Sequence, residues 1–200
     1  MTKATFNFDH KKATQVLNLF AIKEGGAINK MKVLKLVYLA DRYHLRKYGR
    51  PITNDVYFAL DNGPVASGVR DIVEASEFIS DMEREYAARY LMKKGRYDVK
   101  SKAHPDENVF SDSDIEAINF AWEKFGSLDQ WGLRDLTHKY PEWVKHKHIL
   151  QLNSRIQMDL SDFFDDPDTG VEKCFELTDK DKELRREHLQ EISHLESLWR

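Results

Sequence analysis

The segment that decides the fold is residues 29–51, which read NKMKVLKLVYLADRYHLRKYGRP. Asn29 is a typical cap for a helix that starts at residue 30, and Gly49 followed by Pro51 ends it. On a helical wheel most of the circumference is apolar, which predicts a central helix that packs on several sides. The remaining narrow arc is basic and is expected to face solvent; it consists of Lys32, Lys35, Arg42 and Arg46.

An acidic residue interrupts the apolar side of this helix. Asp41 lies in the middle of that side, and His44 follows one turn later. Because a carboxylate is costly to bury unless it is paired and hydrogen-bonded, we expect Asp41 to have a specific partner. The candidates are His44 itself or an Arg or His from a distant part of the chain.

A second Asp-x-x-His pair, Asp135 and His138, falls on a helix expected over residues 128–140. This spacing places both side chains on one helix face. Each of the two pairs is open to two interpretations: a metal site or acid–base pair, or an ion pair or cap that locks helices together. We favour the structural interpretation, because no third ligand with metal-site spacing lies nearby.

Outside the central segment the hydrophobic pattern is mainly helical. Two β elements are expected, a short strand at 55–60 and a hairpin at 88–100 that turns at Lys94-Gly95 and places Tyr90 and Met92 opposite Tyr97 and Val99. The predicted fold class is therefore mainly α with a small β element (α+β), a compact helical domain that ends in a C-terminal helix. The expected helices cover residues 9–24, 30–48, 65–79, 111–125, 128–140, 149–164 and 179–199.

The composition excludes several classes of protein. The chain has 200 residues, with 31 Lys and Arg against 34 Asp and Glu and a formal net charge of −3, so bulk charge does not make it a polyanion binder. Its one cysteine, Cys174, excludes an internal disulfide framework and fits a reducing cytoplasm. No apolar run is long enough to span a membrane, and the first residues lack the apolar core of a signal peptide.

The charge is unevenly distributed along the sequence. Residues 30–50 carry seven basic residues against Asp41 alone, which gives +6. Residues 159–183 carry ten acidic residues against three lysines, which gives −7. Two regions of opposite charge either attract each other within the fold or face different partners, and the sequence leaves both possibilities open.

Motifs of common enzymes are absent from the sequence. It contains no phosphate-binding Gly-x-x-x-x-Gly-Lys loop, no Gly-x-Gly-x-x-Gly and no Gly-x-Ser-x-Gly elbow. Cys174 stands in an acidic segment, which disfavours a reactive thiolate. We therefore predict no catalytic residues, no metal site and no cofactor.

Short blocks follow one another along the chain with a characteristic spacing. The first runs over residues 32–55 and contains Asp41 and His44. In this order and spacing the blocks resemble the Panacea domain of SocA-like antitoxins and phage-associated proteins, over residues 12–148. Residues 149–200 have no counterpart among these blocks. The later blocks are Tyr57-x-Ala-Leu-x-x-Gly63-Pro64-Val65-x-Ser67, Phe110-Ser-Asp-Ser-Asp114, Trp131-x-Leu-x-x-Leu136-Thr137-His138 and Pro141-x-Trp143.

The resemblance implies an antitoxin that neutralises a toxin encoded beside it by direct protein binding, and it implies no enzymatic activity. It also implies a domain over residues 1–148, with residues 149–200 packing on it or extending it. We interpret the polar residues of the matching blocks mainly as a structural lock, with a functional cluster as the alternative. These residues are Asp41, His44, Gly63, Pro64, Thr137 and His138, to which Asp135 is added as the neighbour of His138.

Three surfaces are candidates for contact with the toxin. They are the basic arc of the central helix together with Tyr57, the hairpin at 88–100, and the acidic segment with the amphipathic last helix. The apolar face of that last helix is expected to dock on its own domain. The face comprises Leu184, His188, Ile192, Leu195 and Trp199.

Two other classes of function remain as alternatives. One is an enzyme or metal-binding protein that uses the Asp and His pairs, and the other is a DNA-binding regulator. The acidic segment disfavours contact with nucleic acid. The sequence leaves the oligomeric state open, a homo-oligomer included.

Overall fold

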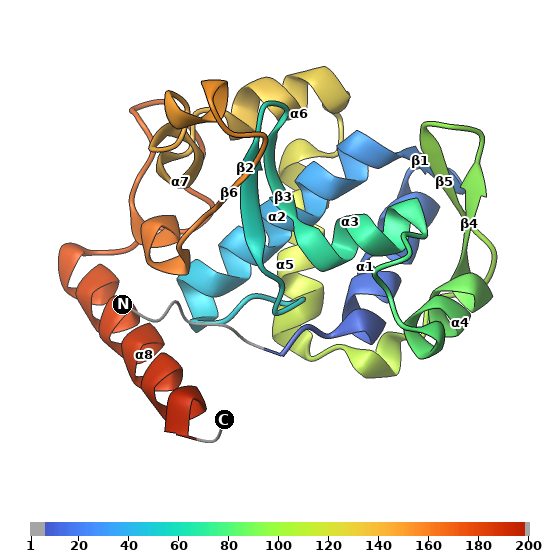
Figure 1. Ribbon diagram of the computed structural model, residues 1–200, viewed down its shortest axis with the longest axis horizontal. Coiled ribbons are helices and arrows are strands. Elements are labelled where there is room, and N and C mark those ends of the chain that lie inside the picture. The colour runs from blue at the N-terminus through green and yellow to red at the C-terminus, as the bar shows by residue number, and fades with distance from the viewer. Residues whose placement is uncertain (1–6, 199–200) are drawn as a thin grey trace.

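The computed structural model describes residues 7–198. In this range the chain forms eight α-helices and two three-stranded antiparallel sheets, which confirms the predicted mainly α class with a small β element. Figure 1 shows the helices arranged around α2, with the two sheets on different sides of the molecule. In chain order the elements are α1 (His10–Lys23), β1 (Ala27–Asn29), α2 (Lys30–Tyr48), β2 (Tyr57–Leu60), β3 (Gly63–Ala66), α3 (Ser67–Glu74), α4 (Asp81–Tyr90), β4 (Leu91–Lys94), β5 (Asp98–Ser101), η1 (Glu107–Val109), α5 (Asp112–Phe125), α6 (Gln130–Thr137), α7 (Pro141–Val144), η2 (Ile149–Gln151), β6 (Ile156–Gln157), η3 (Leu160–Phe164) and α8 (Asp179–Leu198).

The central helix predicted from residues 29–51 is confirmed. The Asn29 side chain accepts hydrogen bonds from the amides of Met31 and Lys32, at 3.0 and 3.3 Å, and so caps α2. Gly49 ends the helix in the left-handed conformation, with φ of 81°. Sixteen of the 19 residues of α2 are buried, as expected of a helix that other elements surround.

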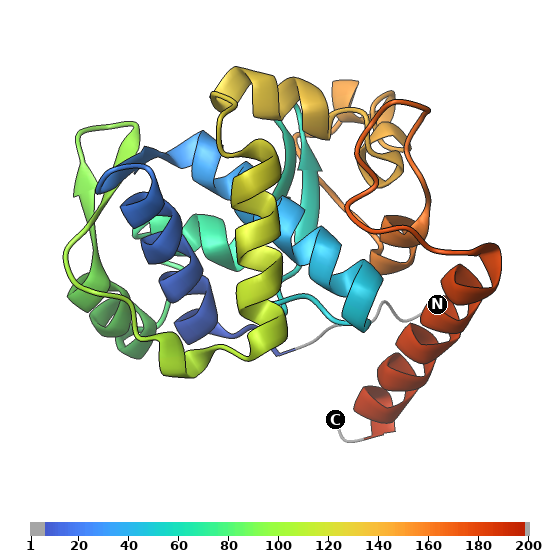
Figure 2. The ribbon, with the colours of Figure 1, turned by 180° about the vertical axis from the view of Figure 1, so that it is seen from behind.

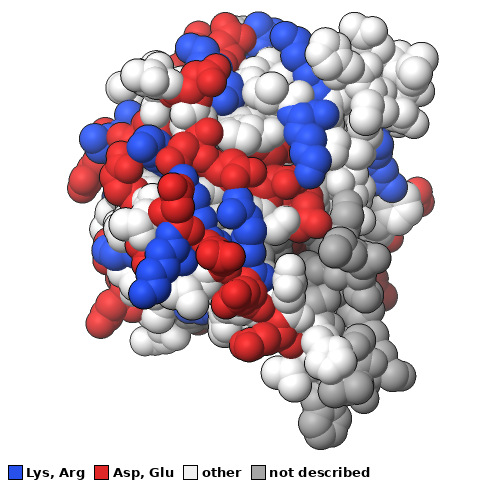
Figure 3. All heavy atoms as spheres, turned by 90° about the vertical axis from the view of Figure 1, so that its left-hand side faces the viewer, with Lys and Arg blue, Asp and Glu red and all other residues white. Residues whose placement is uncertain are grey.

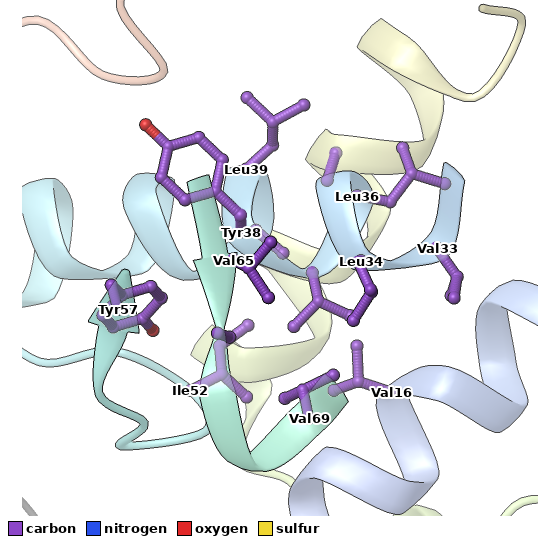
Figure 4. Packing of buried hydrophobic residues seen from close by; sticks show 14 of the residues in the cluster. Val16, Val33, Leu34, Leu36, Tyr38, Leu39, Ile52, Tyr57, Val65 and Val69 are labelled. Atoms are coloured by element: carbon purple, nitrogen blue, oxygen red, sulfur yellow. The ribbon is translucent and has the colours of Figure 1, made fainter. Parts of the chain in front are cut away.

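Other elements cover α2 from several sides. Figure 2 shows α5 crossing α2, with α1 beside them. The sheet β3-β2-β6 lies against α2 on the side that faces the viewer in Figure 1. In the core, Val16 of α1, Leu34 of α2 and Val65 of β3 point toward one another (Figure 4). Burying such side chains stabilises the fold by about 1.5–3 kcal/mol each.

The predicted hairpin exists, but its register is wrong by three residues, because the turn comprises residues 95–97 and not Lys94-Gly95. Met92 pairs with Lys100, and Val99 pairs with Lys93. Because neighbouring residues of a strand point to opposite faces, this shift buries Leu91 beside Val99 and leaves Met92 exposed. The short strand β1, which the sequence analysis did not predict, pairs with β5 and completes this sheet.

Two predicted helices are wrong in extent. Residues 65–79 do not form one helix, because Gly63–Ala66 pairs with β2 as a strand and Ala75 ends α3 in the left-handed conformation. Residues 149–164 form two 3-10 helices and the strand β6, because β6 adds to the edge of β2 through Phe58 and Ala59. In both places, pairing between strands overrides the helix that the local hydrophobic periodicity predicts.

The last helix is rotated relative to the prediction. Leu189 is buried, whereas Leu184 and Leu195 of the predicted docking face are exposed. Trp199 lies outside the described residues. Near the end of α2, Arg185 donates a hydrogen bond to the carbonyl of Lys47. Figure 1 shows α8 standing beside the rest of the molecule. Across residues 7–198 no helix is both long and apolar enough to cross a membrane.

Candidate functional site

Asp41 is the centre of a buried polar cluster between α2 and β2. Its carboxylate accepts hydrogen bonds from the amides of Ile52 and Thr53, at 2.7 and 3.1 Å, and from the hydroxyls of Thr53 and Tyr57, both at 2.7 Å. Burial raises the pKa of Asp41, and the four hydrogen bonds offset only part of this effect, so the pKa remains above its usual value. The prediction that His44 or a distant Arg or His pairs with Asp41 is therefore wrong, because backbone amides and hydroxyls donate the hydrogen bonds that satisfy the carboxylate.

His44 belongs to a different cluster, which joins α2 to the start of α5. Its Nδ1 donates to the carbonyl of Arg50 at 2.6 Å, which leaves Nε2 to accept from the Ser113 hydroxyl at 3.0 Å. Oδ1 of Asp114 lies 3.2 Å from the same Nε2. Burial lowers the pKa of His44. A buried Asp–His contact thus exists, but its acid is Asp114, whose signal in the sequence is the capping box that starts at Ser111.

The second Asp-x-x-His pair does not form a contact. Asp135 is exposed and pairs with Arg134. The ring of His138 instead stacks on Trp143, with ring centroids 3.9 Å apart and an angle of 10° between the planes. Burial, followed by the positive charges of Lys35 and Arg134, lowers the pKa of His138 to about 4. A helical spacing of three residues placed the two side chains on one face but did not bring them together.

Gly63 and Pro64 begin β3 directly after the β2–β3 turn, and they pack tightly against α2 and α6. Nζ of Lys35 donates to the carbonyl of Pro64 at 2.7 Å. Gly63 has φ of 93°, and a Cβ there would lie 2.9 Å from this Nζ, 3.0 Å from the Thr137 hydroxyl and 3.1 Å from Cδ2 of His138. Burial lowers the pKa of Lys35 to about 7. The turn therefore needs glycine for both its conformation and its close packing.

Arg42 is fully buried and makes its strongest contacts with α7 and the acidic segment. Its Nε donates to Oε1 of Glu142 at 2.7 Å, and the Tyr38 hydroxyl donates to the same oxygen. Its two terminal nitrogens donate to the carbonyls of Lys173 and Asp165. Burial, the largest single cause, lowers the pKa of Arg42, but the charge of Glu142 together with smaller contributions from Cys174, Tyr38 and the hydrogen bond to Glu142 outweighs burial, so the pKa is raised. Glu142 was not identified as a candidate from the sequence, although it stands inside the Pro141-x-Trp143 block.

Arg46, one turn later on α2, binds the same segment. Its Nε donates to the carbonyl of Phe175 at 2.9 Å, and Nη1 donates to the carbonyl of Phe163 at 3.0 Å. Nη2 donates to Oδ1 of Asp166 at 2.6 Å, and Lys182 of α8 holds the other oxygen of that carboxylate. We call Arg42 and Arg46, with the residues 163–175 that they bind, the arginine clamp.

The residues predicted to form a partner-binding surface are buried in the structure, so the prediction that they face solvent is wrong. The exposed fractions of Lys32, Lys35, Arg42 and Arg46 are 7%, 1%, 0% and 0%, and that of Tyr57 is 2%. The basic arc faces other parts of this chain: Lys32 pairs with Glu24 at 2.7 Å, and the two arginines bind the acidic segment. The two oppositely charged regions of the sequence therefore attract each other. On the face shown in Figure 3, Asp and Glu side chains alternate with Lys and Arg.

Residues 7–198 contain no group of three or more His, Cys, Asp and Glu side chains arranged to hold a metal ion. The buried thiol of Cys174 contacts the Tyr140 hydroxyl at 3.4 Å, and burial raises its pKa. A raised pKa disfavours the thiolate form that nucleophilic chemistry needs.

A comparison with known protein families identifies the family of this chain. The model of the family described as "Antitoxin SocA-like, Panacea domain" matches residues 33–144, which run from α2 to α7 and include Asp41, Gly63, His138 and Glu142. The chain therefore belongs to the SocA-like antitoxin family with the Panacea domain. No curated protein and no solved structure matches the chain.

Replacing Arg42 tests the clamp. Arg42→Met leaves the buried carboxylate of Glu142 without its counter-charge, so we expect the free energy of unfolding to fall by about 3–5 kcal/mol. The double variant Arg42→Met/Glu142→Leu should recover part of this loss, because no unpaired charge remains. Arg134→Met, at an exposed ion pair, should cost less than about 1 kcal/mol. Urea denaturation measures all three, and a loss below about 1 kcal/mol for Arg42→Met would contradict the account.

Two glycine variants separate backbone strain from close packing. Gly95 also has a positive φ, but a Cβ there meets nothing within 4 Å. Gly95→Ala should therefore cost about 1–2 kcal/mol of strain alone. Gly63→Ala adds a collision with Lys35, Thr137 and His138, for a further loss of about 1–3 kcal/mol. Equal losses in thermal or urea unfolding would show that the turn does not pack as described.

The lowered pKa of Lys35 predicts a pH dependence of stability. Above pH 7 the folded protein holds Lys35 neutral, whereas the unfolded chain keeps it protonated up to about pH 10. The free energy of unfolding should therefore rise with pH relative to Lys35→Met, by up to about 1.4 kcal/mol per unit between pH 7 and 9. His138, which faces Lys35, is already neutral in this range. Lys139→Met, at an exposed site, is the control, and a pH-independent difference for Lys35→Met would refute the prediction.

Proposed function

We propose that this protein is a cytoplasmic antitoxin that neutralises a toxin encoded by an adjacent gene through direct protein binding. The observation that carries the proposal is the family match over residues 33–144. The matched region contains the central helix and most of the elements that pack on it. We also propose that residues 1–148 form the neutralising domain and that residues 149–200 extend it.

The use of the polar residues supports binding rather than catalysis. Asp41 and His44 are saturated by separate sets of internal partners, and Asp135 does not meet His138. A general acid or base must be within hydrogen-bond reach of a substrate, and the buried side chains of Asp41 and His44 are already engaged. The basic arc that a DNA-binding regulator would direct at phosphates is buried as well.

Co-expression with the adjacent gene tests this function. The adjacent gene alone should arrest growth, and this chain, expressed from a second plasmid with an unrelated promoter, should restore it. The two products should then co-purify in a fixed ratio. Separate promoters are needed because repression of a shared operon would otherwise imitate neutralisation. A harmless neighbour, or restored growth without a complex, would refute direct neutralisation.

A further inference from the structure

A groove of about 920 Å³ lies at the N-terminal end of α2. Its walls come from four parts of the chain: α3, the β2–β3 turn, the β4–β5 turn and the start of α6. Its floor is apolar and includes Leu34, Leu60 and Val65. The arginine clamp lies toward the other end of α2, so the chain's own acidic segment is held away from this groove.

Two exposed aromatic residues from different elements line the groove. Trp131 on α6 is 50% exposed, and Tyr97 in the β4–β5 turn is 64% exposed. An arginine lies over each ring, Arg134 at 5.0 Å from Trp131 and Arg96 at 5.4 Å from Tyr97. Trp, Tyr and Arg are the residue types that contribute most to the affinity of protein interfaces. Large aromatic surfaces left in water next to an apolar floor are typical of a docking surface.

The groove has an excess of positive charge on a chain whose net charge is −3. Its lining holds four basic residues and two acidic ones, and without Lys35, which the folded protein holds neutral above pH 7, three basic residues still outnumber the two acids. Lys30 is paired with Glu74 at 2.9 Å, and Lys35 is bonded to the carbonyl of Pro64. Arg70 and Arg96 are exposed and pair with no carboxylate among residues 7–198. Unpaired guanidinium groups beside aromatic rings suit a partner that brings carboxylates.

We propose that this groove is where the toxin docks, through an acidic segment that carries an apolar or aromatic side chain. The apolar side chain fits on Leu34 and Val65 between Trp131 and Tyr97, and carboxylates next to it pair with Arg70 and Arg96. This inference rests on the proposed antitoxin function and names the surface and the partner chemistry that would perform it.

Variants on the groove and at exposed positions outside it test the inference in the co-expression system. Trp131→Ala and the double variant Arg70→Glu/Arg96→Glu should each fail to restore growth and should weaken the Kd for the purified toxin by about tenfold or more. The control variants are Phe78→Ala and the double variant Lys23→Glu/Lys139→Glu, which make matched changes at exposed positions that do not line the groove. Both controls should bind within about twofold of the unmodified protein, and circular dichroism and urea midpoints should be unchanged for all four variants.

The outcomes separate the two proposals. If the unmodified chain binds the toxin and the groove variants bind it equally well, the groove is overturned while the antitoxin function stands. If the unmodified chain neither binds nor restores growth, both are overturned. If Trp131→Ala weakens binding but the charge-reversed variant does not, and raising salt leaves the Kd unchanged, the partner segment is not acidic. A small molecule retained in native mass spectra of the free protein and displaced by Trp131→Ala would overturn a protein occupant.

Discussion

The structure depends on two positive charges that are buried on its central helix. Arg42 and Arg46 have no access to water, and a guanidinium in such a place must find acceptors for its five N–H groups. The chain supplies the acceptors from two later places. One is the carboxylate of Glu142 in α7. The other is a segment more than a hundred residues later, which supplies the carbonyls of Phe163, Asp165, Lys173 and Phe175 and the carboxylate of Asp166. Carbonyls that would otherwise need water are thereby satisfied inside the fold. The acidic segment is therefore part of the packed structure around α2.

The sequence predicted the features whose causes are local. The caps of α2 at Asn29 and Gly49, its nearly all-round burial and the mainly α class follow from neighbouring residues, and all were found. It did not predict what covers each face. A helical wheel shows that Lys35, Arg42 and Arg46 share an arc, but nothing within α2 indicates that a distant segment covers that arc. For the same reason Asp41 and His44 share a helix and yet have different partners. The predictions for the hairpin register and for residues 149–164 were wrong. The pairing of β4 with β5 sets the register, and the pairing of β6 with β2 sets the structure of residues 156–157.

The division between internal and available groups is relevant to the proposed function. Several residues stand out in the sequence, such as Asp41, His138 and the buried arginines. Their contacts lie within the chain, so they stabilise the fold. Groups available to a partner lie in the predicted hairpin, at the short turn that carries Arg96 and Tyr97, and at the start of α6. Turns tolerate sequence changes more readily than a core, so a groove lined by turns suits the proposed role of binding one particular partner.

The central claim is that the arginines of α2 hold the acidic segment in place. Amide hydrogen exchange on the unmodified protein and on Arg46→Met tests it directly, with α5 as an internal reference. In the unmodified protein the amides of residues 160–176 should exchange much more slowly than those of an unstructured chain. In Arg46→Met they should exchange faster while the amides of α5 keep their protection. If these amides exchange as fast as unstructured ones in the unmodified protein, or if Arg46→Met leaves them unchanged, the clamp does not hold the segment.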